Sequence, residues 1–285
     1  MTNNMRWSRY THVFFDCDST LTTVEGIDVL AVNAGLGERV KELTQAAMEG
    51  LIDLDEIYGE RLQAINATRG DIRALREVYK RHTVEDAAAV VNMLIALGHQ
   101  LYIISGGLYE PVREFGVSLG VPPDHIRAVD VDYDKLAGEW WRGRETGIDN
   151  KEDRYLDYRK GALAVSDGKA DIIKQLLSGR SGRSLLVGDG TSDLQAARAV
   201  DLFLGYGGVV VRAVVERDAP VFMRCSSLAP VLALAVGPAM LCKRDHANPE
   251  LVRKAVELVT SGALEFRDEP LRTKFESAWA ANHGS

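Results

Sequence analysis

Short apolar runs recur along the chain and predict buried β-strands. Sequence of helical periodicity fills most of the gaps between these runs. Alternating strands and helices are typical of an α/β fold with a doubly wound, Rossmann-like parallel sheet, in which ligands bind beyond the carboxyl ends of the strands. The expected strands cover residues 12–16, 101–105, 125–131, 184–188, 202–205 and 221–223.

The gap after the first expected strand is too long for a simple crossover. It spans 84 residues before the next apolar run, whereas a crossover needs little more than a dozen. Apolar residues within it recur at spacings of three and four, which is typical of amphipathic helices. We therefore expect a helical-bundle cap at 25–83, inserted into a catalytic core formed by 1–24 and 84–236. Its expected helices cover 27–34, 39–49, 54–65 and 71–79.

Two further segments stand apart from the alternating pattern. The polar stretch at about 130–168 contains glycines and the pair Trp140 and Trp141, so we expect a β-hairpin or long flap there. A C-terminal helical extension is expected at 237–285, with two amphipathic helices, the second beginning around Pro270. The most apolar tract, at 229–241, is too short to cross a bilayer and is interpreted as core packing.

Composition narrows the possible functions. The 285 residues are 46% hydrophobic and carry a net charge of -7 with a pI near 5.5. Without a basic stripe, the chain is not expected to bind nucleic acid or an anionic membrane, and an enzyme for a small molecule fits better. Three cysteines without a CxxC pair, and an N-terminus without a signal-peptide core, favour the cytoplasm. A homodimer is possible from the sequence.

Two aspartates end the first apolar run. In a strand, residues two apart point to the same face, so Asp16 and Asp18 concentrate negative charge at one spot. Buried carboxylates need a partner, and a hard, oxygen-preferring ion such as Mg2+ suits them. Taken alone, the pair is more typical of a solvated turn at a strand end.

Three other segments supply groups that a phosphate reaction needs. Ser105, Gly106 and Gly107 end a strand with a hydroxyl and backbone amides that can face an anion. Lys169 opens a helix and could neutralise a phosphoryl group. A third strand end carries Asp189, which could complete a metal site with Asp16, followed by the supporting residues Ser192 and Asp193. Each segment alone is typical of an ordinary turn, but their placement at strand ends predicts one shared cleft.

These segments resemble the four motifs of the haloacid dehalogenase superfamily of phosphatases. The matching residues are the run at 16–20, Ser105, Lys169 and the Gly-Asp-Gly-x-x-Asp run at 188–193. Within the superfamily, residues 12–235 are most similar to the phosphoserine phosphatases. Three features depart from that pattern: Cys17 between the aspartates, the long stretch between Ser105 and Lys169, and the C-terminal helices.

The resemblance also extends to the cap and to the strand after the fourth motif. It implies that Glu25 contacts the substrate ammonium, that Arg61 pairs with the substrate carboxylate and that Met48 lines the pocket. An acid with a forked cation is also what a zwitterionic amino acid requires, although a surface ion pair is the simpler alternative for two charges on a helical cap. Residues 205–208, followed by Arg212, match the segment after the fourth motif.

The resemblance implies a Mg2+-dependent phosphomonoesterase that acts on a small amino-acid phosphate, with L-phosphoserine favoured. Asp16 would attack phosphorus and form an aspartyl-phosphate, and Asp18 would act as general acid and then general base. Mg2+ would be held by Asp16, the Asp18 carbonyl and Asp189, while Ser105, Gly106, Gly107 and Lys169 would hold the substrate. Alternatives are a phosphatase for phosphohomoserine, phosphothreonine or histidinol phosphate, a phosphotransferase to an alcohol, and a non-catalytic metabolite-binding protein.

Overall fold

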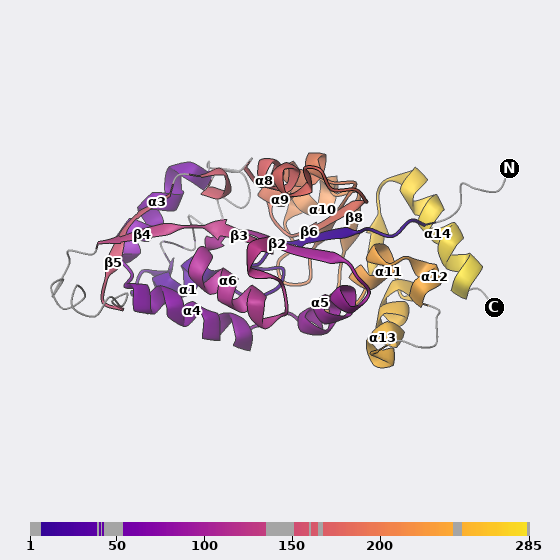
Figure 1. The fold of residues 1–285 in the computed structure, drawn as a ribbon, viewed down its shortest axis with the longest axis horizontal. Helices are drawn as coiled ribbons and strands as arrows, with labels where there is room; N and C mark the ends of the chain where they lie inside the picture. Colours follow the sequence, from indigo (N-terminus) through magenta and orange to yellow (C-terminus); the bar gives the residue numbers. More distant parts are fainter. Residues whose placement is uncertain are drawn as a thin grey trace.

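The centre of the fold is a mostly parallel sheet (Figure 1). The computed structural model describes residues 7–38, 40, 42, 54–134, 151–159, 161–164, 168–241 and 247–283, and within them seven strands form the sheet in the order β3-β2-β1-β6-β7-β8-β9. All neighbouring pairs are parallel except β8 and β9. The strands are β1 His12–Phe15, β2 Gln100–Leu108, β3 Ile126–Val129, β6 Ser184–Gly188, β7 Leu202–Tyr206, β8 Val221–Met223 and β9 Leu264–Phe266.

Helices cover both faces of this sheet, as the alternation of side chains along each strand requires. In β1, Val13 and Phe15 belong to one apolar core, whereas Phe14 belongs to a second core on the other face. Figure 1 shows α5 and α6 on one side of the sheet and α8, α9 and α10 on the other. The doubly wound α/β fold predicted from the sequence is therefore confirmed. These helices are α5 Ala87–Ala96, α6 Tyr109–Ser118, α8 Gly168–Leu177, α9 Thr191–Ala196 and α10 Ala213–Asp218, with short 3-10 turns η2 Ala162–Ala164 and η3 Ala197–Ala199.

Between β1 and β2 the chain forms α1 Gly26–Asn33, α3 Leu54–Ile65 and α4 Arg69–Arg81. The two linkers to the core pair with each other, because Thr23 N donates to His82 O at 2.7 Å and Val84 N to Leu21 O at 2.9 Å. Three predicted helices are thus present, and the helix expected at 39–49 lies mostly outside the described residues. The boundaries of a cap domain at 25–83 remain a proposal.

Helix α4 is bound to the core by ion pairs. Its Arg69 and Arg73 both contact Glu110 of α6, at 2.5 and 2.6 Å, and Arg76 contacts Glu114 at 2.8 Å. The helix begins with a capping box, in which Thr68 and Asp71 satisfy each other's backbone amides. Ion pairs and the edge-to-face packing of Tyr79 on Phe115, with ring centroids 5.7 Å apart, together hold α4 against α6.

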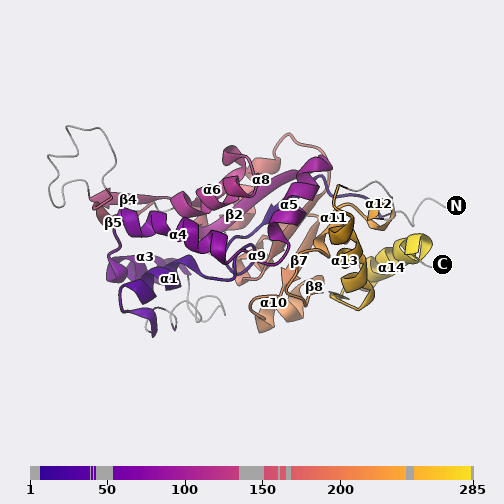
Figure 2. The ribbon, with the colours of Figure 1, turned by 90° about the horizontal axis from the view of Figure 1, so that it is seen from below.

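The stretch for which we expected a hairpin contributes β4 Val131–Asp134 and β5 Arg154–Tyr158, which pair antiparallel in a separate sheet. The single strand predicted at 125–131 was wrong, because this segment is divided between η1 Pro123–His125, β3 and the start of β4. Trp140 and Trp141 lie outside the described residues. Figures 1 and 2 show β4 and β5 beside α3, at the end of the molecule far from the C-terminal helices.

The segment after the sheet forms α11 Val231–Ala235, α12 Pro238–Leu241, α13 Pro249–Thr260 and α14 Glu269–His283. The tract at 229–236 is buried, which confirms the interpretation as core packing. Phe275 of α14 meets Trp7 edge to face, with ring centroids 5.1 Å apart. Strand β9, between α13 and α14, was not predicted and adds an antiparallel edge to the sheet. Among the described residues, no helix combines the length and apolar character needed to span a bilayer.

Candidate active site

The predicted chemical residues meet in one cleft beyond the carboxyl ends of β1, β2 and β6. This position follows from the register, in which Phe15 of β1 lies opposite Ile103 of β2 and Val187 of β6. The cleft is lined by Asp16, Asp18, Glu25, Ile27, Tyr58, Arg61, Ser105, Gly106, Gly107, Leu108, Lys169, Asp189, Gly190 and Ser192. Met48 lies outside the described residues, and Asp193 lies behind the cleft, fully buried.

A tight turn after β1 places the two aspartates. The Cys17 carbonyl accepts hydrogen bonds from the amides of Leu21 and Thr22, at 2.8 and 3.0 Å. Ser19 adopts the left-handed region at φ 54°, which a small polar residue tolerates better than a bulky one. Cys17 itself points away into the apolar core and is fully buried. The turn therefore directs Asp16 and Asp18 into the cleft while Cys17 acts as a small apolar side chain.

Lys169 joins two of the carboxylates. Its Nζ lies 2.9 Å from Asp16 Oδ1 and 2.7 Å from Asp193 Oδ1. Burial disfavours the lysine charge, but the negative charges of Asp16 and Asp193 outweigh it and raise the pKa of Lys169. The other oxygen of Asp193 accepts the Gly190 amide at 3.1 Å. Asp193 therefore holds Lys169 from behind the cleft.

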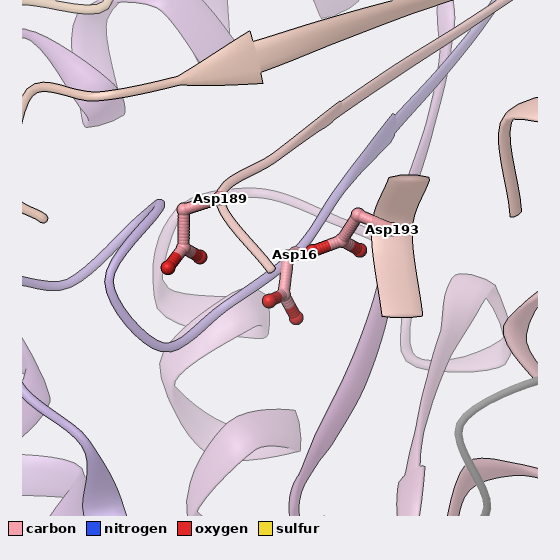
Figure 3. A group of neighbouring side chains, drawn as sticks. All are labelled: Asp16, Asp189 and Asp193. Carbon is pink, nitrogen blue, oxygen red and sulfur yellow. The ribbon is translucent and has the colours of Figure 1, made fainter. Parts of the chain in front are cut away.

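Asp189 is held by side chains from two other segments. Its Oδ1 accepts from Thr20 Oγ1 at 3.0 Å and its Oδ2 from Arg212 Nε at 2.9 Å. Burial raises the pKa of Asp189 to about 7, although the neighbouring Arg212 acts to lower it. Oxygens of Asp16, Asp189 and Asp193 all lie within 4.8 Å of one another, and Figure 3 shows Asp16 between the other two. The described residues thus offer a buried, all-oxygen group that a hard cation could share.

Asp18 is half-buried and contacts the first residue of cap helix α1. One of its oxygens accepts from Gly26 N at 3.4 Å. Burial raises the pKa of Asp18 well above its ordinary value, and the charges of Glu25 and Asp16 raise it further. A raised pKa makes a carboxyl group hold its proton more readily, which suits the role of a general acid.

The loop at the end of β2 lines the same cleft as Lys169. Gly107 N donates to Ser105 Oγ at 2.9 Å, which orients the buried serine hydroxyl. The strand was predicted to end at Ser105, but β2 continues to Leu108, with an irregularity in its pairing to β3 between Ile104 and Leu108. Such a bulge bends the strand. Ser105 and the two glycines after it consequently reach the cleft.

The cap supplies the opposite wall. Glu25 accepts hydrogen bonds from Ser19 Oγ at 2.7 Å and from Arg212 Nη2 at 3.3 Å, and burial raises its pKa. Arg61 of α3 is 3% exposed, and burial lowers its pKa. The cavity between these walls measures about 50 Å³, room for one or two water molecules. A larger ligand therefore requires the walls to separate.

Several residues of the cleft were not among the predicted site residues. Arg212 bridges Glu25 and Asp189, Thr20 supports Asp189, and Tyr58 contacts the Gly106 carbonyl. Thr20 and Arg212 stood within segments that the sequence singled out, so a signal for them existed. Tyr58 had none beyond its place three residues before Arg61 on the same helix.

Comparisons with known proteins agree with this fold. A family model of haloacid dehalogenase-like hydrolases matches residues 10–201. A phosphoserine phosphatase of Drosophila melanogaster is 32% identical over 213 residues, covering 74% of this chain and 73% of that protein. The Homo sapiens phosphoserine phosphatase is 29% identical over 208 residues, covering 73% and 86%. A solved phosphoserine phosphatase, in a phospho-aspartyl intermediate analogue, superposes with a TM-score of 0.64 at 21% identity, covering 79% of this chain and 98% of that one.

Proposed function

Because the chain belongs to the haloacid dehalogenase-like hydrolase family and is a phosphoric monoester hydrolase, we propose that it hydrolyses L-phosphoserine to serine and phosphate. One observation carries this proposal. The groups for phosphoryl transfer, Asp16 and Asp18, share a cleft with Glu25 and Arg61, which are the acid and the forked cation that a zwitterion needs.

In this proposal, Asp16 attacks phosphorus while the seryl oxygen leaves, which gives an aspartyl-phosphate and then a hydrolysis step. Lys169, 2.9 Å from Asp16, stands beside the reacting carboxylate and offsets the negative charge that gathers there. Asp18 donates a proton to the departing oxygen in the first step. In the second step, the same carboxylate takes a proton from the attacking water. The raised pKa of Asp18 supports the first of these roles.

The cluster of carboxylates at the cleft fits a magnesium ion. Asp16 and Asp189 would hold it, together with the Asp18 carbonyl, because each carboxylate oxygen can accept more than the one partner that it has here. When bound, the ion would neutralise negative charge on the phosphoryl oxygens. Asp193, already paired with Lys169 and the Gly190 amide, would stay behind this shell.

The cap wall supports the choice of substrate. Glu25 would receive the substrate ammonium, and its hydrogen bonds from Ser19 and Arg212 hold its carboxylate in position. Arg61 would pair with the substrate carboxylate. A cleft walled by both groups favours a phosphorylated amino acid over a phosphate ester that lacks either charge.

Phosphate release from a panel of phosphomonoesters, with Mg2+ and with a chelator, tests the proposal. We expect L-phosphoserine to be the best substrate, the chelator to abolish turnover, and Asp16→Asn to be folded but inactive. A panel in which no amino-acid phosphate is hydrolysed would contradict the substrate, and turnover that survives the chelator would contradict the metal. Normal turnover by Asp16→Asn would contradict the nucleophile.

A further inference from the structure

Tyr58 forms a direct link between the cap and the loop after Ser105. Its hydroxyl donates to the Gly106 carbonyl at 2.9 Å, so helix α3 is bonded to the segment that faces the phosphoryl group. We propose that Tyr58 is a positioning residue, which fixes α3 over this loop and thereby sets the place of Arg61 and the preference for a substrate with a carboxylate. The inference rests on the proposed function, since it assigns Arg61 to that carboxylate.

The geometry of α3 connects the two residues. Tyr58 and Arg61 are three residues apart and so lie on the same face of the helix. Arg61 Cζ is 5.8 Å from the centre of the Tyr58 ring, within the range of a cation–π contact. Movement of the tyrosine therefore moves the surface against which the guanidinium rests. The position of Arg61 is therefore coupled to that of Tyr58.

The outer side of the Tyr58 ring is also confined. Tyr158 of β5 packs against it, with centroids 5.1 Å apart and planes tilted by 57°. Gly59, the next residue of α3, also lies close to the Tyr158 ring: an added Cβ on Gly59 would be 2.8 Å from Tyr158 Cε1. The β4–β5 pair thus supports α3 from outside, and Tyr58 stands between this support and the cleft.

The hydroxyl matters separately from the packing. Tyr58 is 2% exposed, and a buried hydroxyl is costly unless it has a partner. The partner here is a backbone carbonyl next to Ser105, so forming the bond requires α3 and the loop to be in register. A leucine or phenylalanine could fill the same space without imposing that register. The hydroxyl group therefore fixes the position of α3 relative to the loop after Ser105, which apolar packing alone would not do.

Tyr58→Phe tests the proposal because it removes only the hydroxyl. The measurement is kcat/KM for L-phosphoserine and for phosphoethanolamine, which retains the ammonium but lacks the carboxylate. The ratio of the two values reports carboxylate selection. Tyr10→Phe is the matched control, since the Tyr10 hydroxyl is also buried and accepts from Arg183 at 2.8 Å, just before the amino-terminal end of β1 and so away from the cleft. Thermal unfolding of both variants is measured alongside.

We expect Tyr58→Phe to lower the ratio about fivefold, the worth of one hydrogen bond, through a higher KM for phosphoserine and little change in kcat. Tyr10→Phe should leave the ratio unchanged. An unaltered ratio, or an equal loss on both substrates, would overturn the positioning role while leaving the proposed function intact. A wild-type enzyme without preference for phosphoserine over phosphoethanolamine would overturn the assignment of Arg61, and with it both proposals.

Discussion

Replacing Lys169 with methionine removes the cation between two buried carboxylates with little change in volume. The lysine lies 2.9 Å from Asp16 and 2.7 Å from Asp193, and the three side chains are 5%, 12% and 0% exposed, respectively. Removing one partner from a buried ion pair costs about 3–5 kcal/mol. Because burial has already raised the pKa of Asp193 to about 7, that carboxyl can take up a proton. We therefore expect a loss near the lower limit, about 3 kcal/mol.

Urea denaturation at neutral pH, with chelator present, gives the free energy of unfolding, and a phosphate-release assay follows activity. Lys174→Met is the control, because Lys174 lies in the same helix but is 56% exposed, and its ion pair with Asp171 is long, at 3.8 Å. Its loss should therefore cost under about 0.5 kcal/mol. In Lys169→Met with Asp193→Asn, one of the two carboxylates that lost their partner is made neutral while Asp16 remains, and we expect at least about 1 kcal/mol to be regained without activity. The reasoning is refuted if Lys169→Met costs no more than Lys174→Met, or if the double variant regains nothing.

Three further predictions concern other parts of the molecule. Gly188→Ala would place a Cβ 2.3 Å from Asp193 Cγ, so Asp193 must shift, and we expect a loss of about 1–3 kcal/mol in urea denaturation and at least tenfold slower phosphate release. Burial lowers the pKa of His99 to about 4. As pH falls from about 6.5 towards 4, His99 therefore binds a proton in the unfolded chain but not in the folded protein. We expect up to about 3 kcal/mol of stability to be lost over that interval, and denaturation of His99→Gln across the same pH range should not show this loss. Saturating Mg2+ should stabilise the wild type, by about 2.7 kcal/mol at a Mg2+ concentration of one hundred times Kd, and so raise its melting temperature. Asp189→Asn should show little of this rise in the same calorimetric scan.

The ends of the central strands could be predicted because they depend on local patterns. Apolar runs ending in Asp16 and Asp189 identify β1 and β6, and parallel pairing then brings both aspartates to one edge of the sheet. Ser105 also reached the cleft, although β2 extends three residues past it. That extension depends on a bulge against β3, which is a property of the pairing and not of the run itself.

Contacts made by long side chains could not be predicted in the same way. Arg212 reaches Asp189 across 23 residues of chain and Glu25 across 187, and helix periodicity carries no information about such partners. Tyr58 was part of an apolar pattern that predicted burial correctly, but the pattern could not reveal that its hydroxyl meets Gly106. Strand β9 was missed because Glu265 interrupts its three residues, so they form no apolar run like the one that predicted the equally short β8.

The balance of charge around the cleft explains why the paired aspartates need the rest of the site. Among the described residues at or directly behind the cleft are five carboxylates and three cations, an excess of two negative charges when all are ionised. The carboxylates are Asp16, Asp18, Glu25, Asp189 and Asp193, and the cations are Arg61, Lys169 and Arg212. Such an excess cannot remain buried without compensation. One divalent cation would cancel it, whereas without metal the group must take up protons. The same excess of acid supports the proposed metal affinity and, together with burial, raises the pKa of Asp18.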